Sequence, residues 1–317
     1  MQLDNKAQDT QTQVMQQILL ANLKEQRSAR RWRIFFRLLW LSIIVLVIMY
    51  SINDKHNGIK SGNQKSVGLV ELKGVIGNEE DTYKLMKTSL ENALKDKNIV
   101  GVIIKANSPG GSPVYSDMVY NLIKELTVKY QNKPIDVVIE EVCASGCYYI
   151  ASAMQNIYAS PASIVGSIGV IYTGIGINNL MQKLGIDSRL LIAGKNKAMG
   201  YPLVANNKEQ TKLQQDMLNK VHIQFINAVK NGRMNRLHID DETFSGRYWI
   251  GEDALKIGLI DGFASVDSLA KTKYHTDNII DFTENKDPFD KISKKFGLEI
   301  HSILNEIVAS GSFLKIQ

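Results

Sequence analysis

Ser145 lies where the pattern of the chain changes. A predicted buried strand over residues 135–140 precedes it, and a run of small and apolar residues that is predicted to begin a helix follows it. At the N-terminus of a helix, free backbone N–H groups and the helix dipole favour negative charge. A serine in this place can act as a nucleophile, and it can equally be an ordinary N-cap residue. The junction by itself leaves both interpretations open.

A serine nucleophile needs a base, and the sequence favours a lysine. None of the histidines lies in a glycine-rich or strand-end context; they are His56, His222, His238, His275 and His301. A lysine can take a proton only when it is uncharged, and burial lowers the pKa of a lysine. Lys195 and Lys197 lie in a glycine-bounded loop, residues 194–200, that follows a predicted strand. This loop is the candidate source of the base, with a solvated turn as the alternative.

Acyl transfer also needs hydrogen-bond donors for the oxyanion. Gly110 and Gly111 lie in the loop over residues 107–113, after a continuous apolar strand predicted over residues 100–104. Because glycine lets a backbone N–H group approach a ligand closely, these two residues are candidate donors. A tight Pro-Gly turn without a catalytic role would explain the same residues.

The elements that must position these residues alternate between strands and helices. Strands are predicted over residues 67–76, 100–104, 135–140, 157–159, 164–171 and 187–193, and helices over 81–97, 113–130, 146–154, 177–184, 207–231 and 252–257. Continuous apolar strands are typical of sheets that are buried on both faces. The repeated strand–helix units therefore predict an α/β domain with a largely parallel sheet.

Charge and cysteine content exclude several functions. The net charge is +6, and residues 1–60 carry nine Lys and Arg against four Asp and Glu, so they account for +5 of it. No basic surface is left elsewhere for nucleic acid, so no nucleic-acid partner is expected. Two cysteines, Cys143 and Cys147, form neither a disulfide framework nor a metal motif, and no metal site is expected.

The basic cluster belongs to a predicted membrane anchor. Four arginines at positions 30, 31, 33 and 37 flank an apolar run over residues 38–52, which Trp32, Phe35 and Phe36 extend. A cleaved signal peptide is the first alternative, but residues 49–54 offer no small-residue cleavage site. A buried core helix is the second, but it would not normally begin beside arginines. The distribution of positive charge places the N-terminus in the cytoplasm.

Five motifs in order resemble the signal peptide peptidase SppA family, including its SohB-like membrane-anchored members. They are Asn-Ser-Pro-Gly-Gly at 107–111, Ala-Ser-Gly-Cys-Tyr-Tyr-Ile-Ala at 144–151, Val-Gly-Ser-Ile-Gly-Val at 165–170, Gly-Lys-Asn-Lys at 194–197, and the segment 246–261. Each motif is weak alone, and together they are specific. The resemblance covers about residues 65–270.

The resemblance implies a fold and a role for each site residue. The fold is the crotonase/ClpP-like spiral of ββα units. Ser145 matches the nucleophile, Lys197 the general base, and Ser167 a serine that orients the lysine. Gly110, and less closely Gly111, match the oxyanion hole. Short family members form ring-like homo-oligomers in which serine and lysine meet across a subunit boundary, so these two side chains of one chain are not expected to form a hydrogen bond.

Two positions depart from the family pattern. Cys147 replaces the second glycine after the serine, and Asn196 replaces the usual tyrosine before the lysine. Neither change removes a catalytic atom. Cys147 can pack as a small apolar residue, and a disulfide with Cys143 is possible in an oxidising compartment, but spacing does not establish it.

The sequence therefore predicts a membrane-anchored serine endopeptidase with a Ser–Lys dyad and no cofactor. Its substrates would be hydrophobic peptides such as released signal peptides, and its location would be the bacterial cytoplasmic membrane with the catalytic domain outside the cytoplasm. The alternatives are an inactive peptide-binding scaffold of the same fold and a crotonase-like acyl-CoA enzyme. The expected organisation is a cytoplasmic segment over residues 1–34, an anchor over 35–52, a linker over 53–65, a peptidase domain over 66–275, and an extension over 276–317 with an amphipathic helix.

Overall fold

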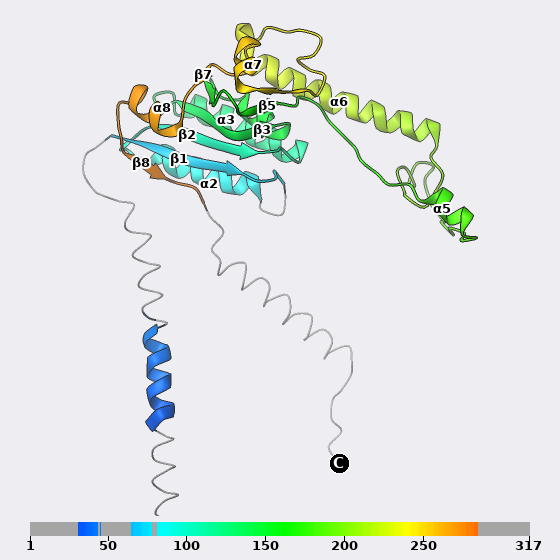
Figure 1. The fold of residues 1–317 in the computed structure, drawn as a ribbon, viewed down its shortest axis with the longest axis horizontal. Coiled ribbons are helices and arrows are strands. Elements are labelled where there is room, and N and C mark those ends of the chain that lie inside the picture. The colour runs from blue at the N-terminus through cyan, green and yellow to red at the C-terminus, as the bar shows by residue number, and fades with distance from the viewer. Residues whose placement is uncertain (1–30, 44, 46–64, 78–80, 285–317) are drawn as a thin grey trace, which may run out of the picture. The chain divides into compact units, whose positions relative to one another are not determined.

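The computed structural model describes residues 31–43, 45, 65–77 and 81–284 (Figure 1). The chain divides into two compact units, residues 1–62 and residues 63–317. Residues 31–43 of the first unit are helical and exposed. Within the described ranges, no helix is long and apolar enough to cross a membrane. Residues 44 and 46–52 of the expected anchor lie outside the described residues, as does the expected amphipathic helix of the tail.

Strands and helices alternate through the second unit (Figure 1). The strands are β1 (Ser66–Lys73), β2 (Ile99–Ser108), β3 (Ile135–Ala144), β4 (Ile157–Ala159), β5 (Ile164–Gly166), β6 (Tyr248–Ile250), β7 (Gly262–Phe263) and β8 (Ile279–Asp281). The helices are α2 (Thr82–Lys95), α3 (Pro113–Lys129), α4 (Gly146–Ala151), α5 (Asn178–Lys183), α6 (Lys208–Arg233), the 3₁₀ helix η1 (Met234–Arg236), α7 (Gly251–Lys256) and α8 (Val266–Thr272).

The described strands form one sheet in which β3 is central. Its order is β6-β5-β3-β2-β1-β8, and β4 pairs with both β3 and β7. All pairs are parallel except β5 with β6. The first half of β3 pairs with β4, and its last three residues pair with β5. The carboxyl end of β3 therefore lies between β2 and β5, and Ser145 follows directly after it.

Helices cover both faces of the sheet. Alternate strand residues point to opposite faces, and on each face they pack against helices. Ile104 of β2 packs in the main core with Leu90 of α2 and Ile123 of α3. Its neighbour Ile103 packs in a second cluster with Leu269 of α8. The predicted α/β class with a largely parallel sheet is confirmed. β8 pairs with β1, so the sheet extends past residue 275, where the peptidase domain was expected to end.

Two predicted strands differ from the structure. Residues 187–193 form no strand and are exposed, and the strand predicted over residues 164–171 ends at Gly166. Residues 164–171 are rich in β-branched residues and residues 190–193 are apolar, but the described chain offers residues 187–193 no strand to pair with. β-Propensity reports packing against neighbours more than an intrinsic backbone preference.

Candidate active site

Ser145 occupies a strained turn between β3 and α4. Its backbone angles are φ 53° and ψ −124°, a conformation that costs a residue other than glycine about 1–3 kcal/mol. Two backbone hydrogen bonds hold the turn: Ser145 N–H donates to the Gly166 carbonyl at 2.8 Å, and Tyr149 N–H donates to the Ser145 carbonyl at 3.0 Å. Every residue of α4 is buried. The serine is therefore fixed through its backbone.

The hydroxyl of Ser145 is unused. The residue stands at the N-cap position of α4, but its side chain makes no capping hydrogen bond. No other described residue bonds to Ser145 Oγ, and the residue is half-buried. By contrast, the N-cap side chains of α2, α3, α6 and α8 each accept a backbone N–H. The geometry thus favours a nucleophile over a helix cap.

Gly110 packs directly against this turn. Its φ is +100°, and a Cβ atom there would lie 2.7 Å from both the Ala144 carbonyl oxygen and the Gly146 nitrogen. Only glycine allows so close an approach of two backbones. The N–H of Gly110 donates to Ser108 Oγ at 3.1 Å. Gly110 therefore shapes the site, while its own N–H is engaged.

Two other backbone N–H groups are available as oxyanion donors. Neither Gly111 N–H nor Gly146 N–H has a hydrogen-bond partner among the described residues. The Gly111 nitrogen lies 3.2 Å from the place where a Cβ of Gly146 would be, so the two residues face each other. Gly146 was not predicted. Its signal in the sequence is its position, because the first residue of a helix has no intrahelical acceptor for its N–H.

Ser167 lies beside Ser145 at the end of the neighbouring strand. Ala144 of β3 pairs with Gly166 of β5, so the two serines are the next residues of adjacent parallel strands. Ser167 also has a positive φ, 52°, and its N–H donates to the Arg247 carbonyl at 2.8 Å. Its hydroxyl has no partner among the described residues. The structure therefore brings together two of the predicted site residues with both hydroxyls free.

Lys197 lies in an exposed segment. From residue 171 to residue 207, which we call the lysine segment, no residue is buried. The backbone of Lys197 donates to the Gly194 carbonyl at 3.0 Å, and its amine has no partner in the described chain. The neighbouring Lys195 pairs with Glu209 of α6 at 2.8 Å. No hydrogen bond joins Lys197 Nζ to Ser145 Oγ within this chain.

Two tyrosines after the serine hold α4 in place. The hydroxyl of Tyr148 donates to the Leu259 carbonyl at 2.7 Å, and that of Tyr149 donates to Asp117 Oδ1 at 2.9 Å. Burial raises the pKa of both hydroxyls far above the ordinary value, and the bond to Asp117 raises that of Tyr149 further. Both tyrosines therefore stay neutral and serve the structure of the site. His222, on α6, donates from Nε2 to the Ile168 carbonyl at 2.9 Å.

A disulfide joins Cys143 and Cys147 across the serine turn. Cys143 belongs to β3 and Cys147 to α4, and both are fully buried. The pairing that the sequence left open is therefore formed. No group of residues in the described ranges could hold a metal ion.

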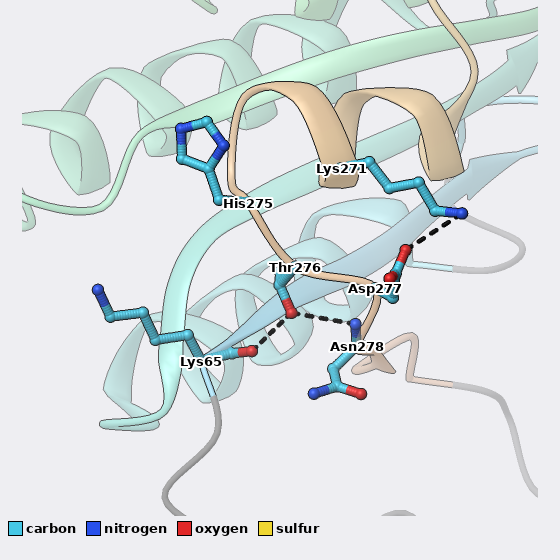
Figure 2. Close-up of a pocket in the computed structure, with 6 residues that line it drawn as sticks. All are labelled: Lys65, Lys271, His275, Thr276, Asp277 and Asn278. Carbon is cyan, nitrogen blue, oxygen red and sulfur yellow. Dashed lines mark hydrogen bonds and ion pairs between the residues drawn. The ribbon is translucent and has the colours of Figure 1, made fainter.

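Two surface hollows lie away from Ser145. One, of about 640 Å³, is lined by Lys65, Lys271 and residues 275–278 (Figure 2). Lys65 precedes β1 and residues 275–278 precede β8, so this hollow lies at the amino ends of the parallel strands. Ser145 lies at the carboxyl ends. The other, of about 840 Å³, lies against the sheet face near Lys105 and Phe263. Neither hollow contains Ser145.

A free serine hydroxyl on a strained strand-to-helix turn, beside unpartnered N–H groups, is the arrangement that serine hydrolases on α/β folds use. The comparisons with known proteins narrow this class. Residues 127–279 match the model of peptidase family S49. Over these residues the chain is therefore similar to this peptidase family, and the resemblance to SppA- and SohB-like proteins is confirmed.

Three relatives illustrate the similarity. A Brucella abortus protein named as the Na(+)/H(+) antiporter NhaA is 40% identical over 195 residues, which are 61% of this chain and 26% of that protein. A Methanocaldococcus jannaschii protein named as a protease is 33% identical over 59% of this chain and 60% of its own length. An Enterococcus faecium protein that bears the name of a signal peptide peptidase SppA is 32% identical over 63% of this chain and 58% of its own length. The chain thus matches between about a quarter and three fifths of these relatives.

Proposed function

We propose that this protein is a membrane-anchored serine endopeptidase in which Ser145 is the nucleophile and Lys197 the general base. The observation that carries the proposal is the free hydroxyl of Ser145 on a strained turn, beside the unpartnered N–H groups of Gly111 and Gly146. The match of residues 127–279 to peptidase family S49 supports peptide hydrolysis as the reaction. Apolar peptides such as released signal peptides are the proposed substrates, in line with the name of the Enterococcus faecium relative.

The residues suggest a two-step mechanism. Neutral Lys197 takes the proton of Ser145 Oγ as that oxygen attacks the scissile carbonyl, and the N–H groups of Gly111 and Gly146 stabilise the oxyanion. The protonated lysine then gives its proton to the leaving amine, which leaves an acyl-enzyme. Water, activated by the same lysine, releases the second product. Ser167, beside Ser145, would orient the lysine amine through its free hydroxyl.

A second copy of the chain would complete the dyad. Lys197 is exposed in one chain, whereas a lysine that acts as a general base needs a buried environment. The lysine segment also exposes large apolar side chains, which are Ile171, Tyr172, Ile175, Ile177, Leu180, Leu184, Ile186, Leu190, Leu191, Ile192 and Tyr201. Packing of this segment against a neighbouring copy would bury both the apolar side chains and the lysine, and burial lowers a lysine's pKa. A ring-like homo-oligomer would provide such a contact between each copy and the next.

The remaining parts of the proposal concern architecture and location. The parallel sheet with helices on both faces is compatible with the crotonase/ClpP-like spiral. The apolar run over residues 38–52 after an arginine cluster supports an anchor in the bacterial cytoplasmic membrane with the peptidase domain on the outer side. The lipid bilayer is then a partner, and neither nucleic acid nor a cofactor takes part.

Hydrolysis of an apolar fluorogenic peptide by the full-length protein tests the proposal. Ser145→Ala and Lys197→Ala should each lower kcat by about 10⁴-fold or more, because members of a catalytic unit fail individually. Lys195→Ala is the matched control, since this neighbouring lysine pairs with Glu209 and should leave kcat within about threefold of wild type. The wild-type rate should rise with pH as the base loses its proton. Peptide binding without hydrolysis by the wild type would instead favour the inactive scaffold.

A further inference from the structure

We propose that the Cys143–Cys147 disulfide positions Ser145 and the Gly146 N–H for catalysis, an inference that rests on the function proposed above. The two cysteines lie two residues before and two residues after the serine, and they are bonded to each other. They are the only cysteines of the chain. Both are fully buried, one at the end of β3 and the other in the first turn of α4.

The helix that follows the serine lacks the usual means of fixing its start. α4 has six residues, and helices of this length are not stable alone. Four other helices are capped by the side chain of their N-cap residue. In α4 the N-cap residue is Ser145, whose hydroxyl makes no capping bond. A nucleophile cannot serve as a cap while its hydroxyl attacks a substrate, so the backbone hydrogen bonds at the start of α4 lack the support of a side-chain cap.

The disulfide supplies a constraint from the centre of the sheet. Cys143 is paired on one side with Ser108 of β2 and on the other with Val165 of β5. The bond to Cys147 therefore ties the first turn of α4 to a row of three strands. Ser108 in the same row accepts the N–H of Gly110, which packs against the serine turn. The serine turn, through the disulfide, and Gly110, through Ser108, are therefore both attached to these three paired strand residues.

The effect of the bond is expected to be local. A disulfide that closes a short loop restricts the unfolded chain little, compared with one that closes a long loop. Without the bond, the serine turn can relax from its strained φ of 53° and the first turn of α4 can shift. Oxyanion donors and nucleophile then lose their alignment, although the rest of the sheet and its helices remain in place.

The burial of both sulfur atoms makes the bond a lasting part of the site. Thiol–disulfide exchange requires a thiolate to reach a sulfur atom, and neither cysteine is exposed. Disulfides persist in oxidising compartments outside the cytoplasm, which is where the anchor would place this domain. The cysteine at 147, where the resembling family has glycine, therefore gains a function rather than merely filling space.

Reduction of the full-length protein by an excess of a dithiol, continued until alkylation shows two free thiols per chain, tests the proposal. Because both sulfur atoms are buried, the reaction is expected to be slow and to need local opening of the serine turn. A dithiol reductant supplies two electrons and two protons, so the disulfide becomes two thiols and the reductant closes into a cyclic disulfide. In the reduced wild type, kcat should fall about 10–100-fold with KM within about twofold, because a small misplacement of reacting groups costs rate rather than binding. Reoxidation should restore kcat, which an effect of irreversible unfolding would not allow.

Hydrogen exchange of the backbone N–H groups over residues 146–149 gives a second readout that does not need activity. Exchange there should become faster on reduction, while exchange in β1 and β2 stays unchanged. The double variant Cys143→Ala/Cys147→Ala should show the same lower kcat and faster exchange, and it should not respond to the reductant. Because the chain has no further cysteine, any response of the wild type belongs to this pair.

Several outcomes would overturn the proposal. Two free thiols in the untreated protein, found by alkylation and mass spectrometry, would show that the bond does not form. An unchanged kcat on reduction, or a loss of activity that only follows the unfolded fraction, would remove the positioning role. The proposed function fails separately: it is lost if the oxidised protein hydrolyses no peptide, whereas the role of the disulfide is lost if exchange over residues 146–149 ignores reduction.

Discussion

The serine turn and the lysine segment are built in opposite ways. Around Ser145, every residue of α4 is buried, and hydrogen bonds, a disulfide and a close glycine contact fix the backbone. Between residues 171 and 207 no residue is buried, and Leu191 is 97% exposed. One chain therefore preorganises the proposed nucleophile and the proposed oxyanion donors, while it leaves the candidate base exposed. In the proposed function, a second copy of the chain would cover that lysine and complete the site.

Helix α6 joins the two regions. Its buried residues, Phe225, Ala228, Val229, Gly232 and Arg233, all lie in its C-terminal half. Its first turn instead carries Glu209, which pairs with Lys195 of the lysine segment on the surface. The contrast between an ordered and an exposed region therefore runs along a single helix.

Mixing two inactive variants provides the most severe test of this comparison. Ser145→Ala and Lys197→Ala proteins, each inactive alone, should recover activity when they are dissociated and assembled together. About a quarter of the interfaces in a random one-to-one assembly would carry an intact serine and an intact lysine. The gain over either variant should reach about 10³-fold. If the mixture stays as inactive as its components, the dyad does not form between copies.

Two glycines with nearly equal φ allow the effect of backbone strain on stability to be separated from the effect of steric contact. Gly110, at φ +100°, would place a Cβ within 3.0 Å of Ala144, Ser145 and Gly146, whereas Gly194, at φ +99°, has nothing within 4 Å. Gly110→Ala should therefore lower the free energy of unfolding by about 4 kcal/mol, from backbone strain and overpacking together. Gly194→Ala should lower it by about 1 kcal/mol, from strain alone. Denaturant unfolding measures both, and equal losses would contradict the difference in packing.

Two ion pairs make the same comparison for charge. Arg233 is fully buried and donates two hydrogen bonds to Asp261, both at 2.8 Å, whereas Lys195 and Glu209 are mostly exposed. Asp261→Asn should destabilise the domain by about 3 kcal/mol, because it leaves a buried cation unpaired. Glu209→Gln should cost less than about 1 kcal/mol. Comparable losses in chemical denaturation would mean that the buried end of α6 is not the stronger attachment.

The buried pair also predicts how stability depends on pH. Burial by itself raises the pKa of Asp261, but the hydrogen bonds and charge of Arg233 outweigh it and hold the pKa below the ordinary value of 3.8. The stabilisation is therefore fully present above that value and is lost as the pH falls through the lower pKa of the folded state. Unfolding free energies of wild type and Asp261→Asn should converge in acid. Parallel curves down to the lowest pH would contradict this assignment.

The smallest effect on the single chain is expected in the lysine segment. Leu191→Ser should change the unfolding free energy of the separated chain by less than about 0.5 kcal/mol, because this side chain makes no buried contact. It should weaken assembly about tenfold, as measured by sedimentation, if a neighbouring copy covers it. Val128→Ser, at an exposed position of α3, is the control and should leave assembly unchanged. Assembly that is insensitive to Leu191 would place the interface elsewhere.

The parts of the fold that could be predicted are those whose signal is local. Continuous apolar runs identify β1, β2 and β3, and the change of pattern at Ser145 identifies the serine junction. Strands β6, β7 and β8 have two or three residues each, which is too short for a periodic signal, and they form because a neighbouring strand offers hydrogen bonds. Residues 187–193 have the composition of a strand but no such neighbour in the described chain.

The site divides in a similar way. Ser145, Ser167 and Lys197 could be named from side-chain chemistry and family resemblance, and the structure places the two serines side by side. Backbone geometry decides that the N–H groups of Gly146 and Gly111 are free and that the N–H group of Gly110 is bonded to Ser108. The sequence carries no direct signal of that geometry. The disulfide likewise required the distance between Cys143 and Cys147 across the turn, which sequence separation does not fix.

A close contact at Gly232 determines the direction in which the long helix α6 leaves the end of α4. Gly232 lies so near Ser152, which follows α4, that a Cβ atom would meet its carbonyl oxygen at 1.8 Å. Helix α6 has 26 residues and is thus about 39 Å long, so a tilt of about 5° at this contact displaces its far end by about 3 Å. A single methyl group at Gly232 would therefore push α6 away from Ser152 and tilt the whole helix. In the proposed assembly, Gly232 would therefore help to set the position of the lysine segment relative to a neighbouring copy, although Gly232 lies in neither the lysine segment nor the serine turn.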